Sequence, residues 1–191
     1  VMSHRAWLWG MVENFPAVRR SLNVGFEGPK GNPGHDREAV CFLMNLGIRR
    51  KDKALIDKAV EISLRVIDYG WDKEYGGIFY FMDRKGYPTQ ELEWDQKLWW
   101  VHIESAIAML KGYRLTGNEK CLEWFLRLDD YLWTRFKDKE YPEWFGYLNR
   151  RGEVLLPRKG GKWIGCFHFP RGLYQIGSML EDISKGKEAC I

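Results

Sequence analysis

DKEYGGIFYFMDRKG, residues 72–86, returns in altered form as DKEYPEWFGYLNRRG, residues 138–152, and this repeat decides the fold. Asp72 corresponds to Asp138, and seven of the fifteen positions are identical between the two copies. Each copy combines an aromatic-rich run with a polar turn that contains glycine, a pattern that predicts a β-hairpin. We therefore expect hairpins at residues 75–87 and 141–154, inserted at equivalent places in a tandem repeat.

Helical patterns of two kinds flank the hairpins. An outer helix carries its apolar side chains on one stripe, whereas an inner helix is apolar on most sides. Outer helices are expected at residues 3–20, 52–69 and 118–136, the first broken near Pro16. Inner helices are expected at residues 36–49, 94–113 and 165–184. Alternating inner and outer helices build a toroid or solenoid, so we expect an all-α fold in which residues 1–191 form a single unit.

The composition excludes several classes of protein. With 45% hydrophobic and 29% charged residues, the chain is typical of folded globular proteins rather than disordered ones. The net charge of +4 is spread among residues of both signs, which does not favour a nucleic-acid partner. No apolar run approaches the roughly 18 to 20 residues that span a bilayer, and the four cysteines lack paired spacing. We expect a cytoplasmic protein without a membrane partner and with reduced thiols.

Three histidines recur in phase with the repeat. His35, His102 and His168 follow one another at the interval that separates the two DKEY copies, to within a single position. If the inner helices run in one direction, these side chains project from the same end of a barrel and converge on one cavity. Each could instead be a core histidine that satisfies a hydrogen bond. Three imidazoles could also hold a zinc ion, which leaves a metal site open at this point.

Carboxylates and aromatic rings accompany the histidines. Glu38 lies three residues after the first of them, on the same helical face, where it can orient the imidazole. Glu104 lies two residues after the second, and Trp99 and Trp100 precede it. Indole faces suit stacking on sugar rings as well as packing in a core. These surroundings favour acid–base chemistry on a sugar over metal coordination.

Five motifs resemble the N-acylglucosamine 2-epimerase family in their order and spacing. They are NPGH (32–35), GWDKEYGGIFYF (70–81), LEWDQKLWWVHIE (92–104), EWFGYLNRRGEV (143–154) and GGKWIGCFHFPR (160–171). The resemblance covers about residues 30–180, and its GCFH-x-PR ending looks more like the N-acylglucosamine branch than cellobiose epimerases or aldose–ketose isomerases. It implies an (α/α)6 barrel, of which this chain resembles the C-terminal half: about half of the ring, six helices with short inserted β-hairpins.

The resemblance also implies an activity and a site. Family members interconvert N-acetylglucosamine and N-acetylmannosamine at C2, after ring opening makes the C2 proton acidic. Inversion needs proton transfer on both faces of that carbon, and the matching motifs give these catalytic roles to His35 and His168. The residues implied to bind substrate are Glu38, His102, Glu104, Trp99, Trp100 and Arg171.

Cofactors and partners follow from the same resemblance. It implies no required cofactor and no metal, although ATP activates some family members without being consumed. The small-molecule partner is an amino sugar. Half a toroid exposes apolar inner faces, so we expect a missing N-terminal half or a homo-oligomer partner to cover them.

Three other functions compete with this one. An aldose–ketose isomerase of the same superfamily abstracts the same C2 proton but returns it to C1. A renin-binding-like half barrel would bind a protein without catalysis. An (α/α)6 glycosidase would use two carboxylates across a glycosidic bond, drawn here from Glu38, Asp95 and Glu104.

Overall fold

The computed structural model describes residues 30–31, 33–83, 89 and 91–187. Within these residues the body of the protein consists of five α-helices, the fourth of which continues into a π-helix, η1. They are α2 (Pro33–Arg50), α3 (Lys53–Gly70), α4 (Trp99–Thr116), α5 (Glu119–Tyr131) with η1 (Leu132–Phe136), and α6 (Phe169–Ser184). The outer helix predicted at residues 3–20 lies outside the described residues.

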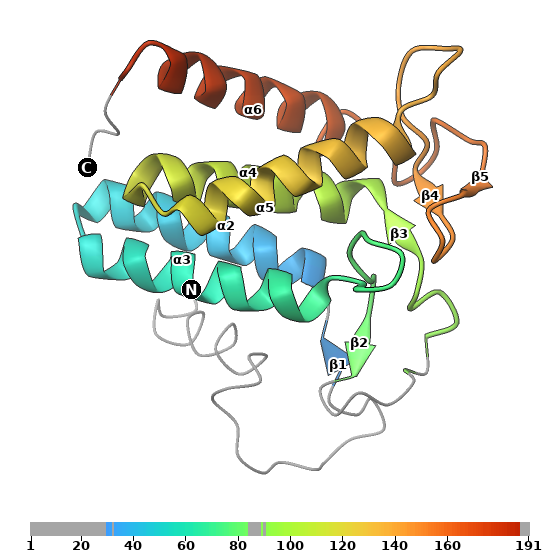
Figure 1. Cartoon of the computed structure of the whole chain (residues 1–191), viewed down its shortest axis with the longest axis horizontal. Coiled ribbons are helices and arrows are strands. Elements are labelled where there is room, and N and C mark those ends of the chain that lie inside the picture. Colours follow the sequence, from blue (N-terminus) through green and yellow to red (C-terminus); the bar gives the residue numbers. More distant parts are fainter. Residues whose placement is uncertain (1–29, 32, 84–88, 90, 188–191) are drawn as a thin grey trace.

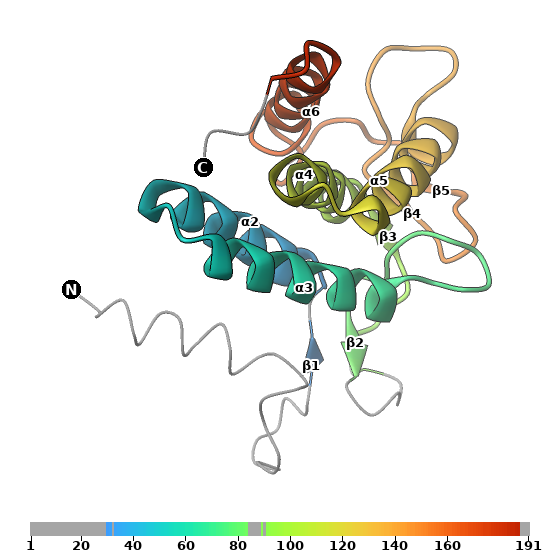
Figure 2. The ribbon, with the colours of Figure 1, turned by 60° about the vertical axis from the view of Figure 1, so that its left-hand side comes forward.

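The helices alternate in direction, as a tandem repeat of inner and outer helices requires. Figure 1 shows α2, α4 and α6 running one way and α3 and α5 running back. Figure 2 shows α3 and α5 on the same side of the α2–α4 pair. Helix α4 contacts α2, α3, α5 and α6, and nearly all of its side chains are buried. The predicted inner helix in the middle of the chain is therefore confirmed.

Two predicted inner helices begin later than expected. Helix α4 starts at Trp99 rather than at residue 94, because Lys97 and Leu98 form a strand first. Helix α6 starts at Phe169 rather than at residue 165, directly before Pro170, whose fixed φ suits the first helical turn. Both shifts place the preceding residues in irregular backbone at the end of the helical layer.

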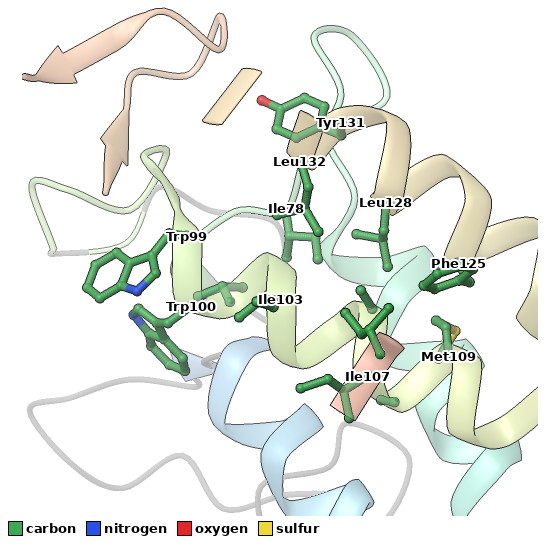
Figure 3. Packing of buried hydrophobic residues seen from close by; sticks show 14 of the residues in the cluster. Ile78, Trp99, Trp100, Ile103, Ile107, Met109, Phe125, Leu128, Tyr131 and Leu132 are labelled. Carbon is green, nitrogen blue, oxygen red and sulfur yellow. The ribbon is translucent and has the colours of Figure 1, made fainter. Parts of the chain in front are cut away.

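The core lies around α4. Figure 3 shows Met109 of this helix close to Phe125 of α5. Ile103 and Ile107 lie against Gly172 of α6. Trp99 and Trp100 occupy the N-terminal end of α4, near the strands. Burial of this apolar surface is the main force that holds the helices together. No helix within the described part of the chain is long and apolar enough to cross a membrane.

Five short strands gather at one end of the helices (Figure 1). They are β1 (Lys30–Gly31), β2 (Met82–Asp83), β3 (Lys97–Leu98), β4 (Tyr147–Leu148) and β5 (Val154–Leu156), within the described ranges. Strand β1 pairs with β2, and β4 lies between β3 and β5, all antiparallel.

The two expected hairpins have different outcomes. In the second repeat, β4 and β5 form a hairpin over residues 147–156, slightly later than the predicted 141–154. The prediction of a hairpin at 75–87 is wrong for the described residues of that range. Strand β2 pairs with β1, and the helices α2 and α3 lie between these two strands in the sequence. Strands β1 and β3 lead into α2 and α4, so each repeat pairs its strand with the one preceding its inner helix. Residues 84–88 of this range lie outside the described residues.

The repeated letters DKEY correspond to a repeated turn. The Oδ1 atom of Asp72 accepts from the amide of Glu74 at 3.0 Å, and that of Asp138 accepts from the amide of Glu140 at 2.9 Å. Each turn is closed by a bridge at the same spacing, Trp71 with Ile78 and Lys137 with Trp144. The sequence repeat is therefore a structural repeat at the level of single hydrogen bonds.

A matched pair of backbone positions gives a test of this repeat. Gly77 has φ 76° and Glu143, its equivalent, has φ 77°, a left-handed conformation that costs an L side chain about 1 to 2 kcal/mol. Replacing Glu143 by glycine should raise the free energy of unfolding by about 0.5 to 1 kcal/mol. Gly77→Ala should lower it by about 2 kcal/mol, since its Cβ would also lie 2.6 Å from the Tyr131 ring.

Urea unfolding followed by tryptophan fluorescence measures both effects. Glu143→Ala is the control, because it removes the side chain but keeps a Cβ in the left-handed region. A Glu143→Gly variant no more stable than Glu143→Ala would contradict the assignment of strain to this position.

Candidate active site

A cavity of about 840 Å³ opens at the end of the molecule where the inner helices begin. Its wall is drawn from α2, the segment before β3, the start of α4, the β4–β5 hairpin and the segment before α6. Five predicted site residues line it, namely His35, Glu38, Trp99, Trp100 and His168. The other lining residues are Tyr80, Glu93, Gln96, Leu98, Tyr147, Leu155, Leu156 and Trp163.

Both predicted bases contact one indole ring. The ring centroids of His35 and Trp100 lie 5.1 Å apart, and those of His168 and Trp100 lie 5.4 Å apart. Helix α2 reaches this ring because Gly34 has no side chain: a Cβ there would lie 2.5 Å from Trp100 Cη2. The two histidines predicted for proton transfer are therefore brought together, although one belongs to the first described helix and the other directly precedes the last.

A buried carboxylate holds His168. Its Nδ1 atom lies 2.8 Å from Oε1 of Glu104, whose side chain is 2% exposed. Arg171 donates to the same oxygen and also to the carbonyl of Phe167 at 2.8 Å. With the proton on Nδ1 bound to Glu104, Nε2 is the nitrogen that can accept a proton from a ligand.

The predicted substrate contacts of Glu104 and Arg171 stay predictions. Neither residue lines the cavity, and the carboxylate of Glu104 accepts from two donors. Such a carboxylate fixes the orientation of an imidazole ring. In this structure Glu104 orients His168, and Arg171 holds Glu104.

His102, predicted to bind substrate, lies in the core and does not line the cavity. It is fully buried, its Nε2 accepts from the amide of Ile78 at 2.8 Å, and its Nδ1 bonds to the carbonyl of Leu98 at 2.7 Å. Its ring stacks on Tyr131 at 5.2 Å, toward the outer helix. The ring lies in the core rather than at the cavity, and among the described residues no group of three His, Cys, Asp or Glu side chains is placed to hold a metal ion.

The spacing accounts for the different direction of this side chain. The interval from His35 to His102 is one residue longer than the interval between the DKEY copies. One residue turns a side chain by about 100° around a helix axis. His102 therefore points into the core, and Trp100 occupies the place between the other two histidines.

A buried ion cluster lies beside the cavity. Oδ2 of Asp72 accepts from Lys97 Nζ at 3.0 Å and from Arg150 Nε at 3.1 Å, while Lys97 and Asp72 are 0% and 1% exposed. Burial lowers the pKa of Lys97 to about 8, although the charge of Asp72 and its hydrogen bond act in the opposite direction. The cluster ties β3 and the β4–β5 hairpin to the turn after α3.

Several lining residues escaped the sequence analysis. Burial raises the pKa of Tyr80 and of Tyr147, so both phenols stay protonated and can donate hydrogen bonds. Glu93 and Gln96 add a carboxylate and an amide. All four residues lie inside the motifs quoted above. Membership of these motifs was the signal by which the sequence could have identified them. Together with two imidazoles, these groups suit a ligand rich in hydroxyl groups.

The family model described as N-acylglucosamine 2-epimerase matches residues 9–169. Among individual relatives, the N-acylglucosamine 2-epimerase of Bos taurus is 46% identical over 160 residues, which are 83% of this chain and 38% of the relative. The chain therefore spans about two fifths of the length of that curated relative.

Solved structures agree on the fold. A D-mannose isomerase superposes with a TM-score of 0.69 at 22% identity, over 77% of this chain and 37% of that one. A cellobiose 2-epimerase from Spirochaeta thermophila DSM 6192 gives 0.66 at 21% identity, over 82% and 39%. Cellobiose 2-epimerases form (α/α)6 barrels, so the described helices are part of such a barrel.

Proposed function

The chain belongs to the N-acylglucosamine 2-epimerase family, and on that premise we propose that it interconverts N-acetylglucosamine and N-acetylmannosamine by proton transfer at C2. The observation that carries the proposal is the meeting of His35 and His168 at one cavity, around Trp100. Because the match covers 38% of the bovine relative, the remaining barrel helices come from a longer protein or from a second copy of the chain.

The reaction follows from the acidity of the open-chain sugar. The aldehyde at C1 stabilises the negative charge left when a base removes the C2 proton, which gives a planar enolate with its oxygen on C1. Return of a proton to the same face restores the substrate, and return to the opposite face gives the epimer. His35 and His168 serve as acceptor and donor, and their roles exchange with the direction of reaction.

His168 has the better-defined environment of the two. Its Nδ1 bond to Glu104 leaves Nε2 for the C2 proton, and the buried carboxylate stabilises the imidazolium that forms. Glu38 lies on the same helix as His35 and lines the cavity, where we propose that it binds a sugar hydroxyl. Only a proton is exchanged, so the proposed reaction requires neither a redox cofactor nor a metal.

We propose that Trp99 and Trp100 line the sugar site, since both indoles border the cavity. The four cysteines of the sequence lack the paired spacing of a disulfide framework, which favours a reducing compartment. A cytoplasmic location is accordingly part of the proposal.

Solvent deuterium distinguishes this function from its nearest rival. Purified protein incubated with N-acetylmannosamine in D2O should yield both epimers with deuterium at C2, followed by proton NMR. An aldose–ketose isomerase cannot make a ketose from this sugar, because its C2 carries nitrogen; in a parallel incubation with mannose it would produce the ketose and carry deuterium at C1. Label at C1 with a ketose product would replace the proposal with the isomerase, and no label at either carbon would reject both reactions.

A further inference from the structure

One wall of the cavity is apolar and lies outside the helical layer. Leu155 and Leu156 of β5 line the cavity together with Trp163 of the following segment. These side chains are 44%, 48% and 69% exposed. Large apolar side chains that gather in the open around a polar cavity indicate a surface that a ligand covers.

Strand pairing anchors the β5 part of this wall. Strand β5 pairs with β4, which pairs with β3, and β3 leads directly into α4. The turn between β4 and β5 is closed by the Asn149 side chain, which accepts from the amides of Arg151 and Glu153 at 2.9 and 3.1 Å. A wall held in place before binding loses little conformational entropy when a ligand arrives.

The tip of the hairpin is anchored to the body of the protein. Arg150 donates to buried Asp72 at 3.1 Å and to Glu74 at 3.0 Å. Leu155 and Leu156 therefore have a defined position relative to His35 and His168. They differ in this respect from the apolar residues of an exposed loop, which have no defined neighbour.

We infer that Leu155, Leu156 and Trp163 form the subsite for the acyl group on the C2 nitrogen of the substrate. This inference rests on the proposed function. An N-acylated hexosamine carries hydroxyl groups at its other carbons, so the acyl chain is its one apolar substituent. It is attached to C2, the carbon on which the bases act, and the cavity that holds the bases continues to this wall.

The experiment compares two sugars that differ at C2. N-acetylmannosamine carries the acyl group, and mannose has a hydroxyl group in its place. Dissociation constants are measured by saturation-transfer NMR for the wild type and for the double variant Leu155→Ala/Leu156→Ala. Loss of apolar contact worth one to two methylene groups should weaken N-acetylmannosamine binding about four- to fifteenfold, while mannose binding changes less than about twofold.

Val154→Ala is the matched control. Val154 belongs to the same strand and is 43% exposed, but it does not line the cavity. It should leave both dissociation constants unchanged. Lengthening the acyl group to propanoyl should tighten binding to the wild type, and the double variant should lose this gain.

Each other outcome overturns the inference. Equal weakening of both sugars would make the wall a support of the cavity rather than an acyl subsite. An unchanged ratio with both sugars still bound would remove the subsite and leave the proposed function standing. Failure of the wild type to bind either sugar would remove both. A change in sedimentation of the double variant, with sugar binding intact, would assign the wall to a protein interface instead.

Discussion

Replacing Asp72 by alanine should lower the free energy of unfolding by about 3 to 5 kcal/mol, the range for removing one partner of a buried ion pair. The substitution leaves the ammonium group of Lys97 fully buried without its carboxylate. It also removes the acceptor of the amides of Glu74 and Tyr75. Equilibrium unfolding in urea measures the loss.

The repeat supplies the control. Asp138 is the equivalent carboxylate, makes the same turn with Glu140 and pairs with Lys159, but its side chain is 14% exposed. Asp138→Ala should therefore cost clearly less than Asp72→Ala. Adding Lys97→Met to Asp72→Ala should restore part of the lost stability, because no buried ammonium remains. Equal losses at the two aspartates, or no recovery in the double variant, would show that burial of the ion pair is not the cause.

The same pair predicts a dependence on pH. Burial acts to raise the pKa of Asp72, but hydrogen bonds from Arg150 and Lys97 and the charge of Lys97 outweigh it and hold that pKa below its usual value. A carboxylate with a depressed folded-state pKa stabilises the protein above the unfolded value of about 3.9, and this contribution disappears as the pH falls through the folded-state pKa. The stability difference between wild type and Asp72→Ala should shrink below about pH 4.

Periodicity predicted the architecture because it reflects burial. Residues 94–113 are apolar on most sides, and the helix found there is the one that the other four surround. The repeat of DKEY predicted equivalent turns, and the turns share their hydrogen bonds. These features are local or periodic, so a single sequence carries them.

Pairings distant in the sequence were not predictable in this way. Strand β2 has its partner β1 before α2, and the residues around β2 do not indicate that partner. Glu104, predicted from the sequence to bind substrate, accepts from His168 and Arg171, which belong to the far end of the chain. The interval from His35 to His102 is one residue longer than the interval between the DKEY copies, and one residue turns a side chain by about 100° around a helix axis.

The largest effect on catalysis is expected at the two histidines of the cavity. His35→Asn or His168→Asn should lower the rate of epimerisation at least about 100-fold, the usual contribution of a general acid or base. Both side chains line the open cavity, so the fold should persist, which circular dichroism checks. Glu104→Gln should also slow the reaction, because glutamine keeps the shape but cannot stabilise the imidazolium of His168.

Exchange with solvent separates the roles of the two bases. Each epimer presents its C2 proton to a different face, and a single histidine can exchange only the proton that faces it. His35→Asn should therefore retain C2 exchange from one epimer in D2O, His168→Asn should retain it from the other, and neither should interconvert the epimers. Normal exchange of both epimers in both variants would show that other groups carry the protons, because loss of either histidine would then have left both faces of C2 served.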